Sequence, residues 1–572
     1  MTTTADQAAT LVGVTPLPAL LRQWAGRLGD EPALTFVDHV ADPGGVATTL
    51  TWAELDARVD EIASCLQPRC ATGDRVAILV EQSADYVAAF LAVIRAGLVA
   101  VPLYPPGLPR FDERLTAVLA DCAPAMLLAS AARVADVKRF GSQCELDGVP
   151  TVPVDALPEG SRQLLEVTHD VAYLQYTSGS TRSPAGVVLT HANVFANACQ
   201  AVEAFEATHE RSVCVSWLPL FHDMGLMLGT AAALVAGMRV VLLDPAAFLA
   251  RPVRWLQALS ANPGAITAAP SFAYAYAAAR TTPAERTLLR LDGVDVLIDG
   301  SEPVAPANIE RFHDTFAECG LRRDAHRPCY GLAEATVLVT SSPAGSAPLE
   351  RAFDAESLAA GVGAPPVPGH RTNTLVACGM PVGQRVQIVN PVSALPVRDG
   401  EVGEVWVSGP NVAVGYWRQP ELSEQVFGAS LPGDPGPWLR TGDLGLLADG
   451  QLFVTGRLKD LVIVDGRNHY PQDIEHTVEH AHPAVRRHTT AAFAVVGADR
   501  ELLVVLAERA KDADPALDRE VTTTVRSAVS AEHGLAVHDL VLLGVGEVPR
   551  TSSGKISRSA CRSWYAAREA AS

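Results

Sequence analysis

The amino-acid sequence predicts an α/β fold: a large N-terminal domain of parallel βα-type sheets with a small β-barrel-like subdomain, then a small α+β C-terminal domain. The first observation is that helix-like patterns alternate with short apolar, often β-branched runs. This alternation is typical of βαβ units whose sheet faces are covered. We expect helices at 17–28, 52–66 and 85–96, and strands at 75–80, 98–103, 125–129, 213–217, 239–243 and 294–298.

The second observation is a change of pattern after about residue 375. Short strands at 386–389, 403–407 and 451–454, with turns at 398–400 and 449–450, indicate antiparallel β structure. A smaller unit follows, with strands at 491–496 and 502–506 around a helix at 515–530. The Pro/Gly-rich stretch 343–368 predicts an irregular insertion. We therefore expect one domain at 1–456, with an insertion at 342–378, and a second at 457–572.

Composition excludes several classes of protein. The 572 residues carry a net charge of −19, which argues against nucleic acid or an anionic membrane surface as a partner. The ten cysteines lack the spacing of metal ligands and are typical of a reducing cytoplasm. The longest apolar stretch, 86–103, is interrupted by Arg95 and Gly97, so it is not a membrane span. The N-terminus shows no signal-peptide pattern. We expect a soluble, cytoplasmic protein.

The strongest local signal is the stretch 174–187, which follows an apolar run and precedes a helix. Its hydroxyl groups and glycines can present O–H and backbone N–H donors to phosphate oxygens. It is not a Walker A loop, because the Gly-Lys-Ser/Thr ending is missing. Composition alone leaves a Ser/Thr-rich surface turn as an equal alternative. The donors are Thr177, Ser178, Gly179, Ser180 and Thr181.

This stretch resembles the phosphate loop of the adenylate-forming superfamily, which includes acyl-CoA ligases, luciferases and peptide-synthetase adenylation domains. The family's motifs come in a fixed order, and matches to seven of them occur in that order in this sequence. They lie at 174–187, 216–225, 299–303, 330–336, 438–443, 456–460 and 549–555. The resemblance thus covers most of the chain and identifies it at the level of the superfamily.

The resemblance implies ATP and Mg²⁺ as co-substrate and cofactor, and it assigns roles to the matching residues. Thr177, Ser178, Ser180 and Thr181 would hold phosphates, Glu334 and Thr177 would hold the metal, and Lys555 would stabilise the transition state. Tyr330 would stack on adenine, Asp443 would accept the ribose hydroxyls, Arg457 would reinforce that contact, and Lys459 would be the interdomain hinge. Further ATP contacts would come from Gly179, Gly300, Ser301, Glu302, Gly331, Ala333 and Ala335. Taken singly, Asp443 could be a turn cap, Glu334 a partner in a helix N-cap and Tyr330 a core residue.

Lysine is rare in this sequence. The only lysines are Lys138, Lys459, Lys511 and Lys555, so two of four fall on the hinge and catalytic positions where the family uses lysine. An ammonium is a compact point charge, whereas a guanidinium is a broad planar fork. The two positions therefore add weight to the resemblance.

Three features favour the fatty acyl-AMP ligases over the acyl-CoA ligases. Arg182 and Ala185 replace the Gly and Lys that CoA ligases usually have in the phosphate loop. The stretch 457–475 matches the hinge signature of the AMP ligases, although Asp465 departs from it. The insertion at 342–378 lies where these ligases carry one that restrains the small domain and disfavours reaction with CoA. A disordered loop is the plain alternative for this insertion.

The acyl-binding residues are harder to identify. The resemblance implies Phe221, His222, Met224 and Gly225, with Ser271 and Phe272, along an acyl tunnel. His222 would orient the carboxylate or simply pack against the aromatic ring at 221. Small residues at 225, 229 and 231–233 leave room for an alkyl chain, although ordinary helix packing explains at least half of them. The implied reaction is ATP-dependent activation of a fatty acid, followed by transfer to the phosphopantetheine thiol of an acyl carrier protein. The alternatives are an acyl-CoA ligase and a non-catalytic acyl-adenylate binding protein.

Overall fold

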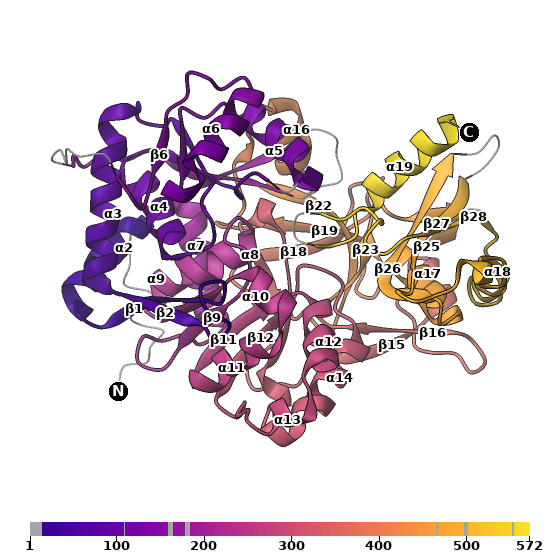
Figure 1. Cartoon of the computed structure of the whole chain (residues 1–572). Helices are drawn as coiled ribbons and strands as arrows, with labels where there is room; N and C mark the ends of the chain where they lie inside the picture. The colour runs from indigo at the N-terminus through magenta and orange to yellow at the C-terminus, as the bar shows by residue number, and fades with distance from the viewer. Residues whose placement is uncertain are drawn as a thin grey trace.

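The computed structural model describes residues 14–107, 109–157, 164–177, 184–464, 467–496, 501–551 and 554–571. Two large sheets form its body (Figure 1). The nine-stranded sheet runs in the order β17-β14-β13-β12-β11-β9-β10-β1-β2, with parallel pairing from β1 to β13 and antiparallel pairing at both edges. Its strands are β1 (Pro32–Asp38), β2 (Val46–Thr51), β9 (Val213–Ser216), β10 (Arg239–Leu243), β11 (Ala265–Ala269), β12 (Val294–Asp299), β13 (His326–Gly331), β14 (Leu338–Ser341) and β17 (Met380–Pro381).

The second large sheet has seven strands in the order β20-β8-β7-β4-β3-β5-β6. Its strands are β3 (Arg75–Ile78), β4 (Val99–Pro102), β5 (Met126–Ala129), β6 (Thr151–Pro153), β7 (Val171–Tyr176), β8 (Gly186–Thr190) and β20 (Gly415–Tyr416). Strands β3 to β7 pair in parallel, and β8 and β20 close one edge in antiparallel fashion. The predicted α/β class with mostly parallel sheets is confirmed.

Helices cover the two sheets because their apolar faces must be buried. The largest core cluster joins side chains of both sheets with those of α2, α3, α4 and α7. The helices of the body are α2 (Leu17–Leu28), α3 (Trp52–Leu66), α4 (Ala84–Arg95), α5 (Pro109–Cys122), α6 (Val134–Gln143), α7 (His191–Ala204), α8 (Asp223–Leu226), α9 (Ala233–Ala236), α10 (Pro245–Ala250), α11 (Val253–Ala261), α12 (Ser271–Arg280), α13 (Pro283–Arg286), α14 (Pro306–Phe316) and α16 (Pro420–Phe427). A π-helix, Met227–Ala232, joins α8 to α9.

An antiparallel sheet occupies the region where the sequence predicts a barrel-like subdomain. Its order is β18-β19-β22-β21, and β23 also pairs with β22. The strands are β18 (Arg385–Val389), β19 (Gly403–Ser408), β21 (Ala429–Leu431), β22 (Asp434–Ala448) and β23 (Gln451–Arg457). The β22–β23 turn has positive φ at both Asp449 and Gly450, as a two-residue hairpin requires.

The prediction of an irregular insertion at 343–368 is wrong for residues 350–359, whereas 343–349 and 360–368 form no helix or strand. Strand β15 (Glu350–Asp354) leads into helix α15 (Ala355–Ala359), and β15 pairs with β16 (Thr372–Val376). Phe353 and Leu358 are buried against Phe453 of β23, so tertiary packing holds the segment in shape. Strand β15 pairs with a strand that lies well beyond it in the sequence. A local sequence pattern does not reveal such a pairing.

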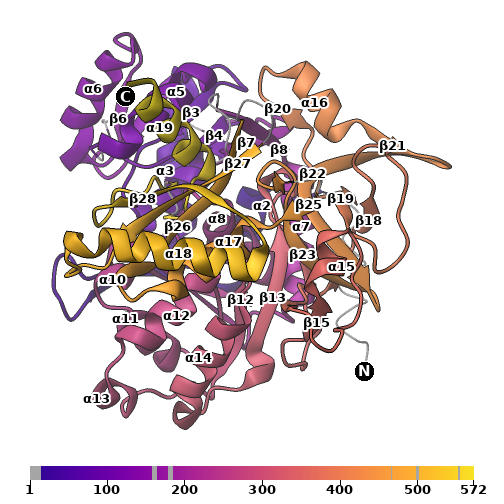
Figure 2. The same cartoon turned by 90° about the vertical axis from the view of Figure 1, so that its right-hand side faces the viewer.

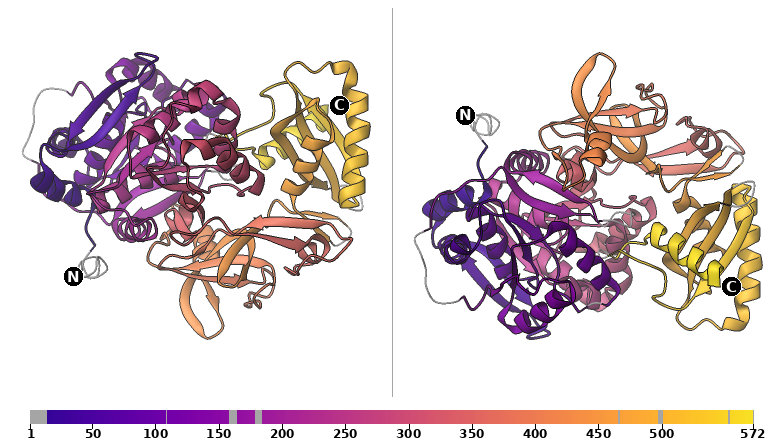
Figure 3. Two further views of the ribbon diagram at one scale, coloured as in Figure 1. Left: turned by 90° about the horizontal axis from the view of Figure 1, so that it is seen from below. Right: turned by 90° about the horizontal axis from the view of Figure 1, so that it is seen from above.

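The C-terminal residues form a separate unit at one side of the body, seen from two directions in Figure 3. After a short hairpin, β24 (Val462–Val464) and β25 (Arg467–His469), a three-stranded sheet is built from β26 (Val485–Val496), β27 (Glu501–Arg509) and β28 (Val537–Leu543). Helices α17 (Pro471–Ala481) and α18 (Asp518–His533) pack on one face (Figure 2), and α19 (Arg558–Ala571) packs on the other. Alternation within β27 produces this arrangement: Leu503 and Val505 face α17 and α18, whereas Val504 and Leu506 face α19.

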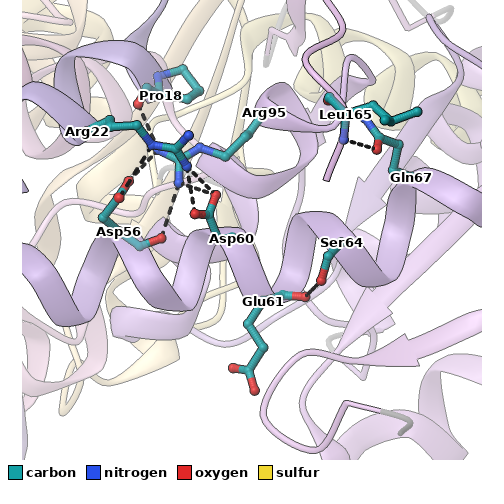
Figure 4. A network of polar contacts seen from close by, with 9 residues as sticks. All are labelled: Pro18, Arg22, Asp56, Asp60, Glu61, Ser64, Gln67, Arg95 and Leu165. Atoms are coloured by element: carbon teal, nitrogen blue, oxygen red, sulfur yellow. Dashed lines mark hydrogen bonds and ion pairs between the residues drawn. The ribbon is translucent and has the colours of Figure 1, made fainter. Parts of the chain in front are cut away.

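An ion-pair network joins α2, α3 and α4 (Figure 4). The Arg95 guanidinium donates to Asp56 at 2.6 Å, to Asp60 at 2.8 Å and to the Pro18 carbonyl at 2.7 Å. The Arg95 side chain is 6% exposed, whereas that of Arg22, which also contacts Asp60, is 52% exposed. The same carboxylate thus has one buried and one exposed partner.

We expect Arg95→Met to lower the free energy of unfolding by about 3 kcal/mol, because it removes a buried cation and leaves the Asp56 carboxylate, 15% exposed, with only a longer contact to Arg22. The matched variant Arg22→Met should cost less than about 1 kcal/mol, since an exposed ion pair is screened by water. Urea unfolding of both variants, followed by far-UV circular dichroism, measures the difference. Equal losses of unfolding free energy in the two variants would show that burial of Arg95 adds nothing to stability.

Candidate active site

A cavity of about 70 Å³ lies beyond the carboxyl ends of β12 and β13. Ligands of open α/β sheets bind in this position, outside the carboxyl ends of parallel strands. The cavity walls are mostly apolar, and Phe205, Met227 and Leu338 are among the side chains that line them. Three polar side chains, Asp223, Ser301 and Tyr330, also face the cavity. An apolar chamber with a few polar groups suits a ligand that has a polar head and an alkyl chain.

Two glycines let the backbone approach closely at the strand ends. A Cβ on Gly331 would lie 1.6 Å from the Val337 carbonyl oxygen, and one on Gly300 would lie 3.0 Å from the Cys329 carbonyl oxygen. Ser301 follows Gly300 with φ +70°, a conformation that costs a non-glycine residue energy. Strained backbone of this kind clusters at functional sites, and Ser301 lines the cavity.

Lys555 reaches this point from the far end of the sequence. Its ammonium donates to the Ser301 hydroxyl at 2.6 Å and to the Ser301 carbonyl. Burial lowers the pKa of Lys555, and the carboxylates of Glu302 and Asp223 oppose that shift. A desolvated ammonium beside a cavity wall acts strongly on a nearby anion, because little water screens it.

Asp223 pairs with its neighbour His222, whose Nδ1 lies 2.6 Å from the Asp223 carboxylate. Burial would raise the pKa of Asp223, but His222 and Lys555 outweigh it, so the pKa is lowered. Met224, the next residue of α8, lines the cavity. Phe221 faces a second, smaller pocket and packs edge-on against Tyr104, with ring centres 5.2 Å apart.

Of the six predicted acyl-binding residues, only Met224 lines the main cavity; Phe221, His222, Gly225, Ser271 and Phe272 lie outside its lining. Gly225 is packed against the Pro219 carbonyl oxygen, which a Cβ would approach to 2.3 Å. Ser271 is fully buried, and its hydroxyl accepts a hydrogen bond from the Ala305 N–H at 3.2 Å. Phe272 donates its backbone N–H to the Glu302 carboxylate at 2.7 Å. The structure thus places Met224 in the cavity wall and pairs His222 with Asp223, whereas Ser271 and Phe272 contact the segment after β12.

Asp443 and Arg457 face each other across β22 and β23, where they are paired in register. The Arg457 Nε donates to Asp443 at 2.9 Å, and the Tyr330 hydroxyl donates to the other carboxylate oxygen at 2.9 Å. Asp443 raises the pKa of Arg457, so the guanidinium stays charged. Asp443 lies within a strand, and Tyr330 lines the cavity, so neither is only a turn cap or a core residue.

Glu334 lies in a short 3₁₀ turn, Ala333–Ala335, after β13. Its carboxylate accepts a hydrogen bond from the Tyr416 hydroxyl at 2.8 Å. Burial raises the pKa of Glu334. Ala333 and Ala335 are buried beneath it, and the Ala335 carbonyl accepts from the Asn411 side chain at 2.9 Å. A half-buried carboxylate whose hydrogen-bonded partner is a neutral hydroxyl is a fitting ligand for a hard cation.

Thr177 directly follows β7, and its carbonyl accepts from the Arg114 guanidinium. Ser178, Gly179, Ser180 and Thr181, like Arg182, lie outside the described residues. Within the described residues, no group of three or more His, Cys, Asp and Glu side chains forms a metal cluster. This is compatible with Mg²⁺, which often binds through one or two carboxylates and substrate phosphates.

Lys459 is exposed in the turn between β23 and β24. The insertion contacts the C-terminal unit close by: Asn373 donates to Asp473 at 2.8 Å, and Arg371 donates to His533 at 3.1 Å. Tyr470 is buried with Phe353 and Leu358 of the insertion. In Figure 1, β16 lies beside the C-terminal unit, in agreement with the contact of its Asn373 with Asp473 of α17.

Sequence reasoning missed several residues of this site. Asp223 was readable, since an acidic residue directly follows His222 in the aromatic/His motif. Tyr416 gave no local signal, because its contact with Glu334 joins residues 82 positions apart. The same holds for the apolar wall, where Phe205 and Leu338 come from different elements and meet only in the fold.

Two family models match the chain. One, described as AMP-binding enzyme, matches residues 21–417, and the other, described as Disco-interacting protein 2-like AMP domain, matches residues 459–571. The long-chain-fatty-acid–AMP ligase FadD26 of Mycobacterium marinum is 44% identical over 96% of this chain and 97% of that protein. The putative fatty-acid–CoA ligase FadD25 of Mycobacterium tuberculosis is 42% identical over 96% of this chain and 97% of that protein.

Solved structures agree with these relatives. A chain from the study of the fatty acyl-adenylate ligases of E. coli and L. pneumophila has a TM-score of 0.87 and 31% identity, covering 97% of this chain and 98% of the other. The fatty acyl-adenylate ligase of L. pneumophila in complex with acyl adenylate and pyrophosphate has a TM-score of 0.74 and 32% identity, covering 96% of each chain. Among the described residues, no helix is both long and apolar enough to cross a membrane. By fold, by family model and by identity over nearly its whole length, the chain belongs to the AMP-binding enzymes, in the branch of the fatty acyl-AMP ligases.

Proposed function

We propose that this enzyme activates a fatty acid with ATP, forming bound acyl-adenylate and pyrophosphate, and then passes the acyl group to the phosphopantetheine thiol of an acyl carrier protein. One observation carries the proposal: the Lys555 ammonium contacts Ser301 at the wall of an apolar cavity, 254 residues away in the sequence. A cation at the wall of an alkyl-binding chamber is suited to a fatty carboxylate that attacks a phosphate.

Each neighbouring residue has a part in this reaction. The fatty carboxylate attacks the α-phosphate of ATP, and catalysis consists mainly of positioning and charge neutralisation. Lys555 lies between the two anions and stabilises the charge of the transition state. Tyr330 supports the adenine ring beside Gly300, and Asp443 accepts the ribose hydroxyls while Arg457 holds its carboxylate. His222 orients the carboxylate through its pair with Asp223.

The side chains of Glu334 and Thr177 fit Mg²⁺ by their chemistry. Carboxylate and hydroxyl oxygens are its preferred protein ligands, and Glu334 and Thr177 supply one of each. The ion would neutralise phosphate charge and orient the pyrophosphate leaving group. Tyr416 holds the Glu334 carboxylate in place by its hydrogen bond.

The choice of acceptor is the finer part of the proposal. FadD26 is named an AMP ligase and FadD25 a putative CoA ligase, so the relatives' names leave both acceptors possible. Contacts between the insertion and the C-terminal unit favour the carrier protein. Asn373–Asp473, Arg371–His533 and the packing of Tyr470 would hinder the rotation that a CoA ligase needs. We also propose that the domains divide at 456/457, that the small one moves about Lys459, and that the enzyme is cytoplasmic.

We expect the enzyme loaded with ¹⁴C-labelled dodecanoate and ATP to form acyl-adenylate and transfer it to a phosphopantetheinylated carrier protein at least about tenfold faster than to CoA. The double variant Asn373→Ala/Arg371→Ala should lower the ratio of the carrier-protein rate to the CoA rate, since it removes two contacts that hold the small domain. Thin-layer chromatography of the products and gel autoradiography of the carrier give both rates. Faster acyl-CoA formation would identify an acyl-CoA ligase. Absence of ATP–pyrophosphate exchange with every fatty acid would indicate a non-catalytic binding protein.

A further inference from the structure

The C-terminal unit contains a largely buried triad of charged side chains. Arg558, the first residue of α19, donates to both carboxylate oxygens of Glu475 in α17, at 2.7 and 2.6 Å. Its third nitrogen donates to Asp460 at 3.2 Å. The side chains of Arg558, Asp460 and Glu475 are 21%, 17% and 12% exposed. One guanidinium thus binds two carboxylates from two separate elements.

The triad is close in sequence to both the proposed hinge residue Lys459 and the proposed catalytic residue Lys555. Asp460 is adjacent to Lys459 in the turn after β23, and Arg558 is three residues beyond Lys555. Glu475 also accepts the Ala492 N–H of β26 at 2.9 Å, so the triad is attached to the central sheet of the unit. It therefore connects the proposed hinge, the sheet and the lysine-bearing segment.

The backbone around Lys555 is held in a short loop that ends at the triad. The Thr551 N–H donates to the Lys555 carbonyl at 2.7 Å, and the Ser557 N–H donates to the Pro549 carbonyl at 3.0 Å. Ile556 bridges to Arg550 and packs against the core under α19. With this loop set on α19, the direction of the Lys555 side chain depends on where Arg558 anchors the start of that helix.

We infer that Arg558 is a positioning residue for Lys555: by clamping Glu475 and Asp460, it fixes the lysine-bearing loop to the hinge turn, so that Lys555 reaches Ser301 when the small domain closes. This inference rests on the proposed function, in which Lys555 acts in adenylation. A guanidinium is suited to the task because its planar fork binds a carboxylate in two places and defines an orientation. A lysine at 558 would keep the charge and lose the orientation.

The first measurement is the ATP–pyrophosphate exchange of Arg558→Lys with dodecanoate. We expect kcat to fall about tenfold, because misplacing a catalytic group by a fraction of an ångström costs that order of rate. The KM for ATP should change less than about threefold, because the nucleotide contacts lie elsewhere. Asp460→Asn, which leaves the Glu475 clamp intact, should lose about threefold in kcat by the same reasoning.

A double-mutant cycle separates positioning from general stability. If Arg558 acts through Lys555, Arg558→Lys should have less than about a twofold effect in a Lys555→Ala background. Arg509→Lys is the matched control: Arg509 makes a two-point contact with Asp518 in the same unit, away from the hinge and the loop. It should keep kcat within about twofold of the parent enzyme.

The outcomes are distinct. Wild-type kcat in Arg558→Lys, or an equal loss in the presence and absence of Lys555, would overturn the inference while the proposed function stands. If Arg558→Lys does not fold, Asp460→Asn takes its place in the double-mutant cycle with Lys555→Ala and tests the inference. A wild-type enzyme without exchange activity would refute the proposed function and this inference together.

Discussion

Replacing Lys555 by alanine should lower the rate of ATP–pyrophosphate exchange by about 10²–10³-fold, the loss expected when one preorganised charge contact to a transition state is removed. The ammonium lies at Ser301 in the cavity wall, near Asp223 and Glu302. Binding of a non-reactive acyl-adenylate analogue should weaken much less, since the contact is strongest in the transition state. Lys511→Ala is the matched control, because Lys511 is exposed in the same unit.

The pH dependence of ATP–pyrophosphate exchange gives a second test of the role of Lys555. Burial lowers its pKa from the ordinary 10.5, so the ammonium loses its proton at a lower pH than a solvated lysine would. Exchange activity that needs the ammonium is retained below this pKa and falls as the pH rises through it. The alkaline decline should disappear in Lys555→Ala. An unchanged pH profile, or near-normal exchange by the variant, would contradict the catalytic role of Lys555.

Replacing Glu334 by glutamine should lower exchange by about 100-fold or more at limiting Mg²⁺, because a charged ligand is lost. Tyr416→Phe removes only the hydrogen bond that orients the carboxylate, and loss of such a supporting contact costs about 10–100-fold in metal affinity. The measurement is the Mg²⁺ concentration for half-maximal exchange. Excess Mg²⁺ should restore Tyr416→Phe more fully than Glu334→Gln.

The thermal stability of the Glu334→Gln variant provides the control for this experiment. Burial raises its pKa, so keeping the carboxylate ionised at neutral pH destabilises the metal-free protein. Glutamine removes that destabilisation, and the melting midpoint of metal-free Glu334→Gln should be equal to or above that of the parent. A variant that loses both activity and stability would indicate a structural role for Glu334 and refute its role as a metal ligand.

Local sequence patterns predicted many of the helices and strands well. The helix at 17–28 and the strand at 239–243 have the predicted bounds, because a side-chain period of 3.6 or 2 and the flanking turn residues are local properties. The insertion at 342–378 was predicted, but its regular elements β15, α15 and β16 were not. Its order depends on pairing across more than 15 residues and on contacts with Phe453.

The candidate site likewise contains residues that the sequence predicted and features that only the structure revealed. The motif order placed Tyr330, Asp443 and Lys555 on the list of functional residues, since each lies in a short stretch with recognisable neighbours. It could not distinguish residues that line the cavity from residues that support it. Met224 lines the wall, whereas Gly225, directly after it, is packed against the Pro219 carbonyl.

The sequence by itself determined the α/β class, the order of the motifs and the family, because these depend on local periodicity and on short stretches of residues. It also singled out the rare lysines, two of which lie in the turn after β23, the proposed hinge, and beside Ser301 in the cavity wall. Only the tertiary structure decided which side chains meet. The pair Glu334–Tyr416, the contact Lys555–Ser301 and the clamp of Arg558 on Glu475 join residues far apart along the chain, and no local pattern encodes distances that the packing of whole sheets sets.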